Sequence, residues 1–191
     1  MTTILSLYGG PGSGKSTSAA FMFAMFKHAG TNAELVREYV KDNWAWEKRP
    51  IGEFDQLYFL AKQMRREYTL LDKVDFVVTD SPVWMASYYA EKYCEAYIRH
   101  SVLSSALGYY EQTKKRGHRH VHVWVKRSKP YNPAGRYQTE TEARAIDGEL
   151  RAFLEERGIP LVEVSSDPES LTEFVSRICA EVVNERNPEK V

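Results

Sequence analysis

Cysteine, net charge and long apolar runs are all scarce in this sequence. Its only two cysteines, Cys94 and Cys179, lie far apart and outside any paired-cysteine motif. This excludes a small disulfide-stapled scaffold and is typical of a reduced intracellular protein. No apolar stretch reaches the roughly 18 residues that a membrane-spanning helix needs, and the first residues show no basic-then-apolar leader. We therefore expect a cytoplasmic protein without a membrane partner.

The charges cancel, with 26 basic and 26 acidic residues among 191. A neutral balance argues against indiscriminate binding to nucleic acid, which needs a basic surface. One local basic segment, residues 114–120, leaves contact with DNA phosphates open as an alternative. Within it and just beyond, His118, His120 and His122 alternate, but no cysteine or carboxylate joins them at metal-ligand spacing. Histidines at the start of a strand are the better interpretation.

Strand-like and helix-like segments alternate along the chain, a pattern typical of a parallel sheet covered on both faces. We predict strands at Thr3–Tyr8, Ala33–Arg37, Phe76–Thr79, Val121–Val125 and Leu161–Val164. The predicted helices are Lys15–Ala29, Phe54–Leu71, two between Val83 and Arg116, Glu140–Arg157 after an N-cap at Thr139, and one from Asp167–Pro168. The expected fold is one three-layer α/β domain over residues 1–191, with a mostly parallel five-stranded sheet.

A phosphate-binding motif follows the first strand and precedes the first helix. Residues 9–16, Gly-Gly-Pro-Gly-Ser-Gly-Lys-Ser, match G-x-x-x-x-G-K-[ST] in full. Its glycines let backbone N–H groups point at phosphate oxygens, and the helix start adds its positive dipole end. Lys15 is expected to reach the β- and γ-phosphates of ATP. The nucleotide-binding residues are predicted to be Gly10, Gly12, Ser13, Gly14, Lys15, Ser16 and Thr17.

A carboxylate follows the third predicted strand. Asp80 follows the apolar run Phe76–Thr79 directly. In a parallel sheet this edge faces the nucleotide, so Asp80 and the Ser16 hydroxyl are expected to hold Mg²⁺. The alternative is that Asp80 only caps the helix that follows.

The segment after the second predicted strand brings another carboxylate to the same edge. Glu38 is the candidate base for a hydroxyl acceptor, which must lose a proton during phosphoryl transfer. Tyr39, Asp42 and Trp44 are candidate acceptor contacts, the aromatic rings by stacking on a base. The alternative is that these aromatic residues are core and these carboxylates are solvated.

A loop rich in cations, proline and glycine follows the fourth predicted strand. It spans about residues 126–139 and has the character of a mobile lid that closes over phosphates. Arg127 and Arg136 are the candidates for stabilising the transferring phosphoryl group, because guanidinium suits bidentate phosphate contacts. A solvated charged loop is the alternative.

Together these residues resemble small P-loop kinases of the nucleoside and nucleotide kinase superfamily, especially ATP-binding proteins of tailed bacteriophages. The resemblance covers the P-loop, residues 37–42, 55–58 and 79–82, and the lid sequence Lys-Pro-Tyr-Asn-Pro-Ala-Gly-Arg-Tyr-Gln-Thr-Glu at 129–140. Glu38-Tyr39-Val40 with Trp44 looks similar to the Glu-Pro-Val and Trp of deoxynucleoside kinases, with Tyr39 in place of proline. Asp80-Ser81-Pro82 stands where those kinases carry Glu-Arg-Ser.

The resemblance implies an ATP- and Mg²⁺-dependent kinase whose acceptor is a nucleoside-type hydroxyl. That acceptor is either a free (deoxy)nucleoside or, as in phage kinases that modify DNA, the hydroxymethyl group of hydroxymethyluracil. A phage origin would place the protein in the host cytoplasm. Two alternatives stay open: a nucleoside monophosphate kinase, and a non-kinase ATPase or nucleotide-sensing module.

Overall fold

The computed structural model describes residues 1–128, 130–134 and 136–186. Its sheet contains the strands β1 (Thr3–Tyr8), β2 (Ala33–Val36), β3 (Phe76–Thr79), β4 (Arg119–Lys126) and β5 (Leu161–Ser165). The strands run parallel throughout, in the order β2-β3-β1-β4-β5. The predicted five-stranded parallel sheet is confirmed.

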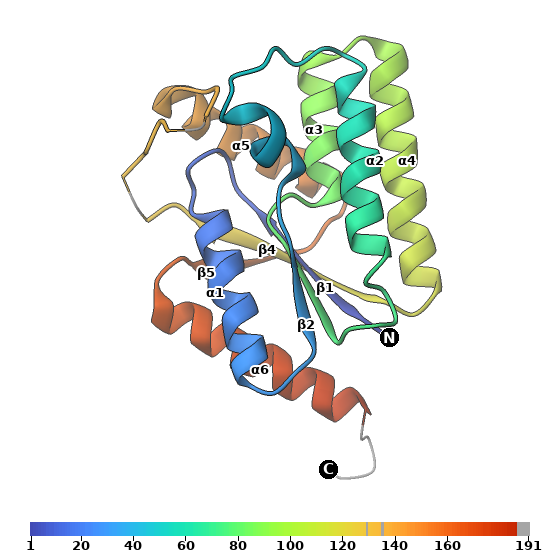
Figure 1. Ribbon diagram of the computed structural model, residues 1–191, viewed down its shortest axis with the longest axis vertical. Helices are drawn as coiled ribbons and strands as arrows, with labels where there is room; N and C mark the ends of the chain where they lie inside the picture. The colour runs from blue at the N-terminus through green and yellow to red at the C-terminus, as the bar shows by residue number, and fades with distance from the viewer. Residues whose placement is uncertain (129, 135, 187–191) are drawn as a thin grey trace.

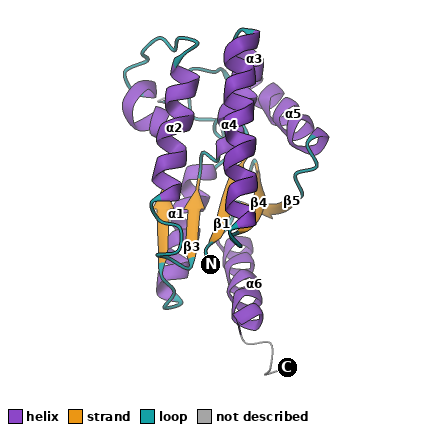
Figure 2. Ribbon diagram, turned by 90° about the vertical axis from the view of Figure 1, so that its right-hand side faces the viewer, coloured by secondary structure: helices purple, strands orange, loops and turns teal. Residues whose placement is uncertain are grey.

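Helices cover both faces of this sheet (Figure 1), as the sequence predicts. On one face lie α1 (Lys15–His28) and α6 (Pro168–Arg186), which pack against each other. The opposite face carries α2 (Asp55–Tyr68), α3 (Val83–Tyr93), α4 (Ala96–Lys115) and α5 (Glu140–Glu156). Figure 2 shows α2, α3 and α4 gathered into one group beside the sheet. None of the described helices combines the length and apolar character needed to cross a membrane.

The central strand β1 is buried along its whole length, and its side chains alternate between the two helical layers. Leu5 and Leu7 pack in the cluster formed with α1 and α6. Tyr8 packs with α3, α4 and α5 on the other side. This two-sided burial explains the continuous apolar run in the sequence, and it fixes the end of β1 from which the phosphate-binding loop departs.

Local signals in the sequence set several element boundaries as predicted. Gly30, with φ +76°, follows the end of α1. At the start of α5, the Thr139 hydroxyl accepts from the Glu142 amide at 3.3 Å, and the Glu142 carboxylate accepts from the Thr139 amide at 2.7 Å. This capping box confirms the predicted N-cap. The expected break between α3 and α4 falls at Cys94 and Glu95.

Beyond shifts of a single residue, three features of the fold differ from the sequence prediction. The helix α2 ends at Tyr68, before the predicted Leu71. The strand β4 begins at Arg119, earlier than the predicted Val121, because Arg119 and His120 already pair in register with β1. After β2 the chain forms a π-helical turn, η1 (Lys41–Ala45), which the sequence did not predict. This turn shapes the mouth of the pocket described below.

The histidines and the basic segment have structural partners. Tyr8 Oη and His122 Nδ1 lie 3.0 Å apart, and Thr113 Oγ1 and His120 Nε2 lie 2.8 Å apart. Burial lowers the pKa of His122 to about 4 and that of His120 to about 3. Within the described ranges, no group of three or more histidine, cysteine or acidic side chains is arranged to hold a metal ion. The metal alternative therefore finds no support there.

The arginines of the basic segment are occupied by carboxylates. Arg116 pairs with Asp72 at 2.7 Å, and Arg119 pairs with Glu181 and, at 3.1 Å, with Glu185. These ion pairs offset the charge of the two arginines, and contact of the segment with DNA phosphates stays an untested alternative.

Candidate active site

The phosphate-binding motif forms a tight loop between β1 and α1. Gly9, Gly12 and Gly14 have φ angles of 140°, 77° and 103°, a region that side chains rarely adopt. Gly14 lies directly before the first residue of α1. Ser13 is buried, and its hydroxyl has no hydrogen-bond partner among the described residues. The loop therefore has the backbone shape of a phosphate cradle, with a buried hydroxyl left free beside it.

Lys15 is folded onto the inner side of this loop. Its Nζ donates to the carbonyl oxygens of Gly9 at 2.6 Å and Gly10 at 3.0 Å. Burial lowers the pKa of its ammonium group, and the Glu38 and Asp80 carboxylates oppose that shift. The cation is thus held between the loop and two acidic side chains, where phosphate oxygens can compete for it.

Two carboxylates meet at the neighbouring strand ends. Asp80, which follows β3, is only 4% exposed, and its Oδ1 accepts from the Glu38 amide at 2.8 Å. Burial raises the pKa of Glu38, Asp80 raises it further, and Lys15 lowers it. The hydrogen bond fixes the path of the chain after β2, so the position of Glu38 depends on Asp80. Ser16, at the start of α1, and Asp80 offer hard oxygen ligands of the kind that Mg²⁺ prefers.

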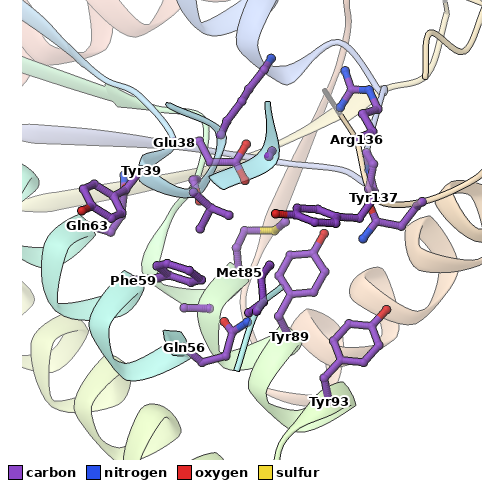
Figure 3. Close-up of a pocket in the computed structure, with 18 of the residues that line it drawn as sticks. Glu38, Tyr39, Gln56, Phe59, Gln63, Met85, Tyr89, Tyr93, Arg136 and Tyr137 are labelled. Carbon is purple, nitrogen blue, oxygen red and sulfur yellow. The ribbon is translucent and has the colours of Figure 1, made fainter. Parts of the chain in front are cut away.

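A pocket of about 610 Å³ joins these charged groups to an apolar compartment. Figure 3 shows Glu38 and Phe59 on one side, with Arg136 and Tyr137 of the lid loop on the opposite side. The side chains that line it come from separate segments. They include Lys15, Glu38, Tyr39, Lys41, Lys48, Gln56, Phe59, Gln63, Asp80, Met85, Tyr89, Tyr93, Arg136 and Tyr137.

The three predicted acceptor contacts have different surroundings. Tyr39 lines the pocket, and its hydroxyl lies 2.7 Å from that of Tyr58. Trp44 packs edge-on against Phe59, with ring centroids 5.0 Å apart, and does not itself line the pocket as described. The Asp42 side chain lies outside the described residues. Stacking of Trp44 on an acceptor base stays a prediction. In the structure, Trp44 packs against the ring of the pocket residue Phe59.

The two lid arginines lie at different places. Arg136 lines the pocket and donates from Nε to the Asn132 carbonyl at 3.0 Å. Arg127 instead turns toward α5, where it pairs with Asp147 at 2.8 Å beside the P-loop. Of the predicted lid, Lys129 and Gly135 lie outside the described residues. The structure therefore associates Arg136 with the pocket and Arg127 with the nucleotide loop.

Several pocket residues were not predicted from the sequence, although their helical spacing indicated that they share one face. Gln56, Phe59 and Gln63 recur along one side of α2, and Met85 and Tyr89 are four residues apart on α3. Such spacing places side chains on one helical face. Buried glutamines on an otherwise core-facing stripe are the feature that marks a binding wall rather than ordinary core.

The lid is tied to the opposite rim of the pocket. The Tyr137 hydroxyl donates to the Arg49 carbonyl at 2.8 Å, which links the lid loop to the segment after η1. Tyr137 is 39% exposed, so its ring forms part of the pocket mouth. This contact between distant segments was not predictable from the local sequence.

Comparison with known proteins agrees with this geometry. The family model described as an AAA domain matches residues 5–170. No curated protein matches the sequence. A solved structure of deoxyadenosine kinase from M. mycoides, with products dCMP and a flexible dCDP bound, is similar with a TM-score of 0.56. It shares 15% identity, over 93% of this chain and 99% of that one.

Two NadR structures have higher TM-scores but longer chains. NadR in complex with NAD and AMP-PNP gives a TM-score of 0.65 at 16% identity, covering all of this chain and 51% of that one. NadR in complex with NR also gives 0.65, at 14% identity, with coverage of 85% and 45%. The chain thus spans about half the length of the NadR chains. At identities this low, the structural similarity shows a shared fold. With a complete phosphate-binding motif, this sheet order and a family match over most of its length, the chain belongs to the AAA domain family and has the P-loop NTPase fold.

Proposed function

We propose that this protein is a Mg²⁺-dependent kinase that transfers the γ-phosphoryl group of ATP to a hydroxyl of a nucleoside-type acceptor. One observation carries the proposal: a single pocket contains Lys15 of the P-loop, the Glu38 carboxylate and a wall of amide and aromatic side chains. Its volume, about 610 Å³, falls in the usual range for small-molecule sites. A protein that only hydrolyses ATP does not need this second compartment beside its phosphate loop.

The P-loop supplies the donor end of the reaction. Its backbone amides and Lys15 would bind the ATP phosphates, and Ser16 and Asp80 would hold Mg²⁺. When bound, Mg²⁺ would neutralise charge on the phosphates. The free Ser13 hydroxyl and the glycine backbone fit such a ligand. Among the structural neighbours, NadR has been solved with AMP-PNP, which supports an ATP-type donor for this fold.

Glu38 is the proposed base. The acceptor hydroxyl oxygen bonds to the γ-phosphorus while the bond to the oxygen bridging the β- and γ-phosphates breaks, and the hydroxyl proton passes to Glu38. The raised pKa of Glu38 makes its carboxylate a better proton acceptor than an exposed glutamate. Lys15 and Arg136 line the same pocket and would stabilise the negative charge of the phosphoryl group.

The acceptor end suits a flat, polar-edged ligand. Phe59, Met85 and Tyr89 offer apolar and aromatic surface, while Gln56 and Gln63 can hydrogen-bond to base edges. Gln63 already donates to Thr79 Oγ1 at 3.1 Å, which fixes its orientation. We therefore favour a free (deoxy)nucleoside or, if the gene is of phage origin, the hydroxymethyl group of hydroxymethyluracil in DNA.

A second candidate is a nucleoside monophosphate kinase. Lys41, Lys48 and Arg136 all line the pocket, and cations would suit an acceptor that already carries a phosphate. Glu38 argues for a hydroxyl instead, because a phosphate acceptor is anionic and needs no base. A third class, an ATPase or nucleotide sensor, makes no use of the acceptor compartment.

Product analysis distinguishes these functions. The protein is incubated with γ-labelled ATP and Mg²⁺ beside deoxynucleosides, deoxynucleoside monophosphates, ordinary DNA or hydroxymethyluracil DNA. Label on a nucleoside, or on DNA only when the hydroxymethyl base is present, supports the hydroxyl kinase and identifies its acceptor. Diphosphate products would support the second candidate. Label released only as inorganic phosphate in every reaction would contradict both kinase proposals.

A further inference from the structure

Asp147 of α5 contacts the P-loop although it lies 137 residues beyond Gly10 in the sequence. Its Oδ1 accepts from the Gly10 amide at 2.6 Å. Its Oδ2 pairs with two nitrogens of Arg127, Nε at 2.8 Å and Nη2 at 2.8 Å. One carboxylate thus connects the backbone of the phosphate loop to the first arginine of the lid.

The approach of α5 to the loop is as close as glycine permits. A Cβ added to Gly10 would lie 2.6 Å from the Ala143 carbonyl oxygen and 2.7 Å from Asp147 Oδ1. Real side chains do not tolerate such distances, so any larger residue at Gly10 would displace either the loop or α5. The loop and the helix are therefore packed as one unit, and the Asp147 contact is not an incidental surface interaction.

The third nitrogen of Arg127 faces the P-loop. The Arg127 side chain is only 10% exposed, and its Nη1 is buried with no hydrogen-bond partner in the described part of the chain. A Cβ added to Gly12 would lie 3.3 Å from this Nη1, so the nitrogen adjoins the loop backbone. A buried donor without an acceptor is unfavourable, and a phosphate oxygen bound at the loop is the acceptor that this position suits.

The geometry points to Asp147 as a positioning residue of the nucleotide site. It holds the Gly10 amide with one oxygen and the Arg127 guanidinium with the other, so that Nη1 can donate to a phosphate of the bound nucleotide. The inference rests on the proposed function only for the identity of that nucleotide. The competing interpretation is a purely structural tether between α5 and the loop.

Calorimetric binding of ATP with Mg²⁺, without any acceptor, tests this role directly. In Asp147→Asn the side chain keeps an oxygen for the Gly10 amide but loses the carboxylate that pairs with Arg127. We expect Kd for ATP to rise by about tenfold, the scale set by loss of a charge-assisted pair. The matched control is Glu155→Gln, which breaks an exposed pair with Arg151 (2.9 Å) on the same helix, and we expect it to leave Kd unchanged.

A double-mutant comparison separates positioning from tethering. If Asp147 acts through Arg127, then Arg127→Ala with Asp147→Asn binds ATP as weakly as Arg127→Ala alone. Fully additive losses would overturn the positioning role. So would unchanged ATP affinity in Asp147→Asn. Thermal unfolding of each variant shows whether it is folded.

If Asp147→Asn does not fold, Arg127→Gln carries the same test, because it removes the charge while keeping a polar side chain. Full ATP affinity in Arg127→Gln would overturn the inference. The outcomes also separate this inference from the proposed function. Wild-type protein that binds no ATP would overturn both, whereas wild-type binding with unaffected variants would overturn only the role of Asp147.

Discussion

The donor and acceptor ends of the pocket are built in different ways. The donor end is a continuous loop, residues 9–16, whose backbone conformation is set by glycines and by contacts from α5. The acceptor end is assembled from side chains of η1, α2, α3 and the lid, brought together only by folding. Phosphate is bound largely by backbone amides, so a short sequence suffices, whereas an acceptor is recognised by side chains whose positions depend on tertiary packing.

The largest effect should come from the donor end. Lys15→Ala removes the cation that lies between the loop and the carboxylates, and we expect transfer to fall by about a thousandfold, by analogy with loss of a preorganised charge-stabilising group. Labelled-product assays measure the loss. Lys27→Ala, an exposed lysine near the other end of α1, is the control and should retain full activity. Substantial activity in Lys15→Ala would remove the P-loop lysine from the mechanism.

The junction between the two ends should give the next largest effect. Glu38→Gln keeps the shape but cannot accept a proton, so we expect about a hundredfold slower transfer with ATP binding retained. Because burial raises the pKa of Glu38, wild-type activity should be lost on acidification at a higher pH than for an exposed glutamate. That acidic limb should disappear in the variant. Glu34→Gln, on β2, is the control, and unchanged transfer in Glu38→Gln would exclude Glu38 as the base.

A buried carboxyl group that hydrogen-bonds to the pocket residue Gln63 should affect the stability of the fold. Glu67 of α2 is 2% exposed, and burial raises its pKa to about 8. The folded state therefore keeps a proton that the unfolded state has lost, so stability should fall as pH rises from about 4.5 toward 8, by up to about 1.4 kcal/mol per pH unit. Chemical denaturation of Glu67→Gln should show a flatter pH dependence. An equal slope in both proteins would contradict a protonated Glu67 at neutral pH.

The smallest effect should come from the rim of the acceptor end. Tyr137→Phe keeps the ring but removes the hydrogen bond to Arg49, worth about 1 kcal/mol. We expect KM for the acceptor to rise by about fivefold with Kd for ATP unchanged. Tyr68→Phe, which removes a hydroxyl bonded to Arg116 at 3.2 Å away from the pocket, is the control. A matching rise in Kd for ATP would show that the two ends are not separable.

The same contrast explains what the sequence could predict. The sheet, its helices and the capping box at Thr139 follow from local patterns, and the structure confirms them. It also confirms that the phosphate-binding motif lies between β1 and α1. Glu38 and Asp80 could be placed at one sheet edge because parallel strands share a carboxyl end. Asp147 could not be foreseen, because only packing of α5 against Gly10 brings it to the loop. The contact between Tyr137 and Arg49, and the turn η1, likewise depend on distant segments.

The coupling between ATP consumption and acceptor phosphorylation tests the central claim most directly. With the acceptor that product analysis identifies, ADP and phosphorylated acceptor are measured together in the wild-type protein, with and without that acceptor. We predict that ADP forms at a low rate alone, rises when the acceptor is added, and then matches the phosphorylated acceptor in amount. ADP formation that is unaffected by the acceptor, with phosphate released to water, would contradict a pocket in which donor and acceptor meet at Glu38.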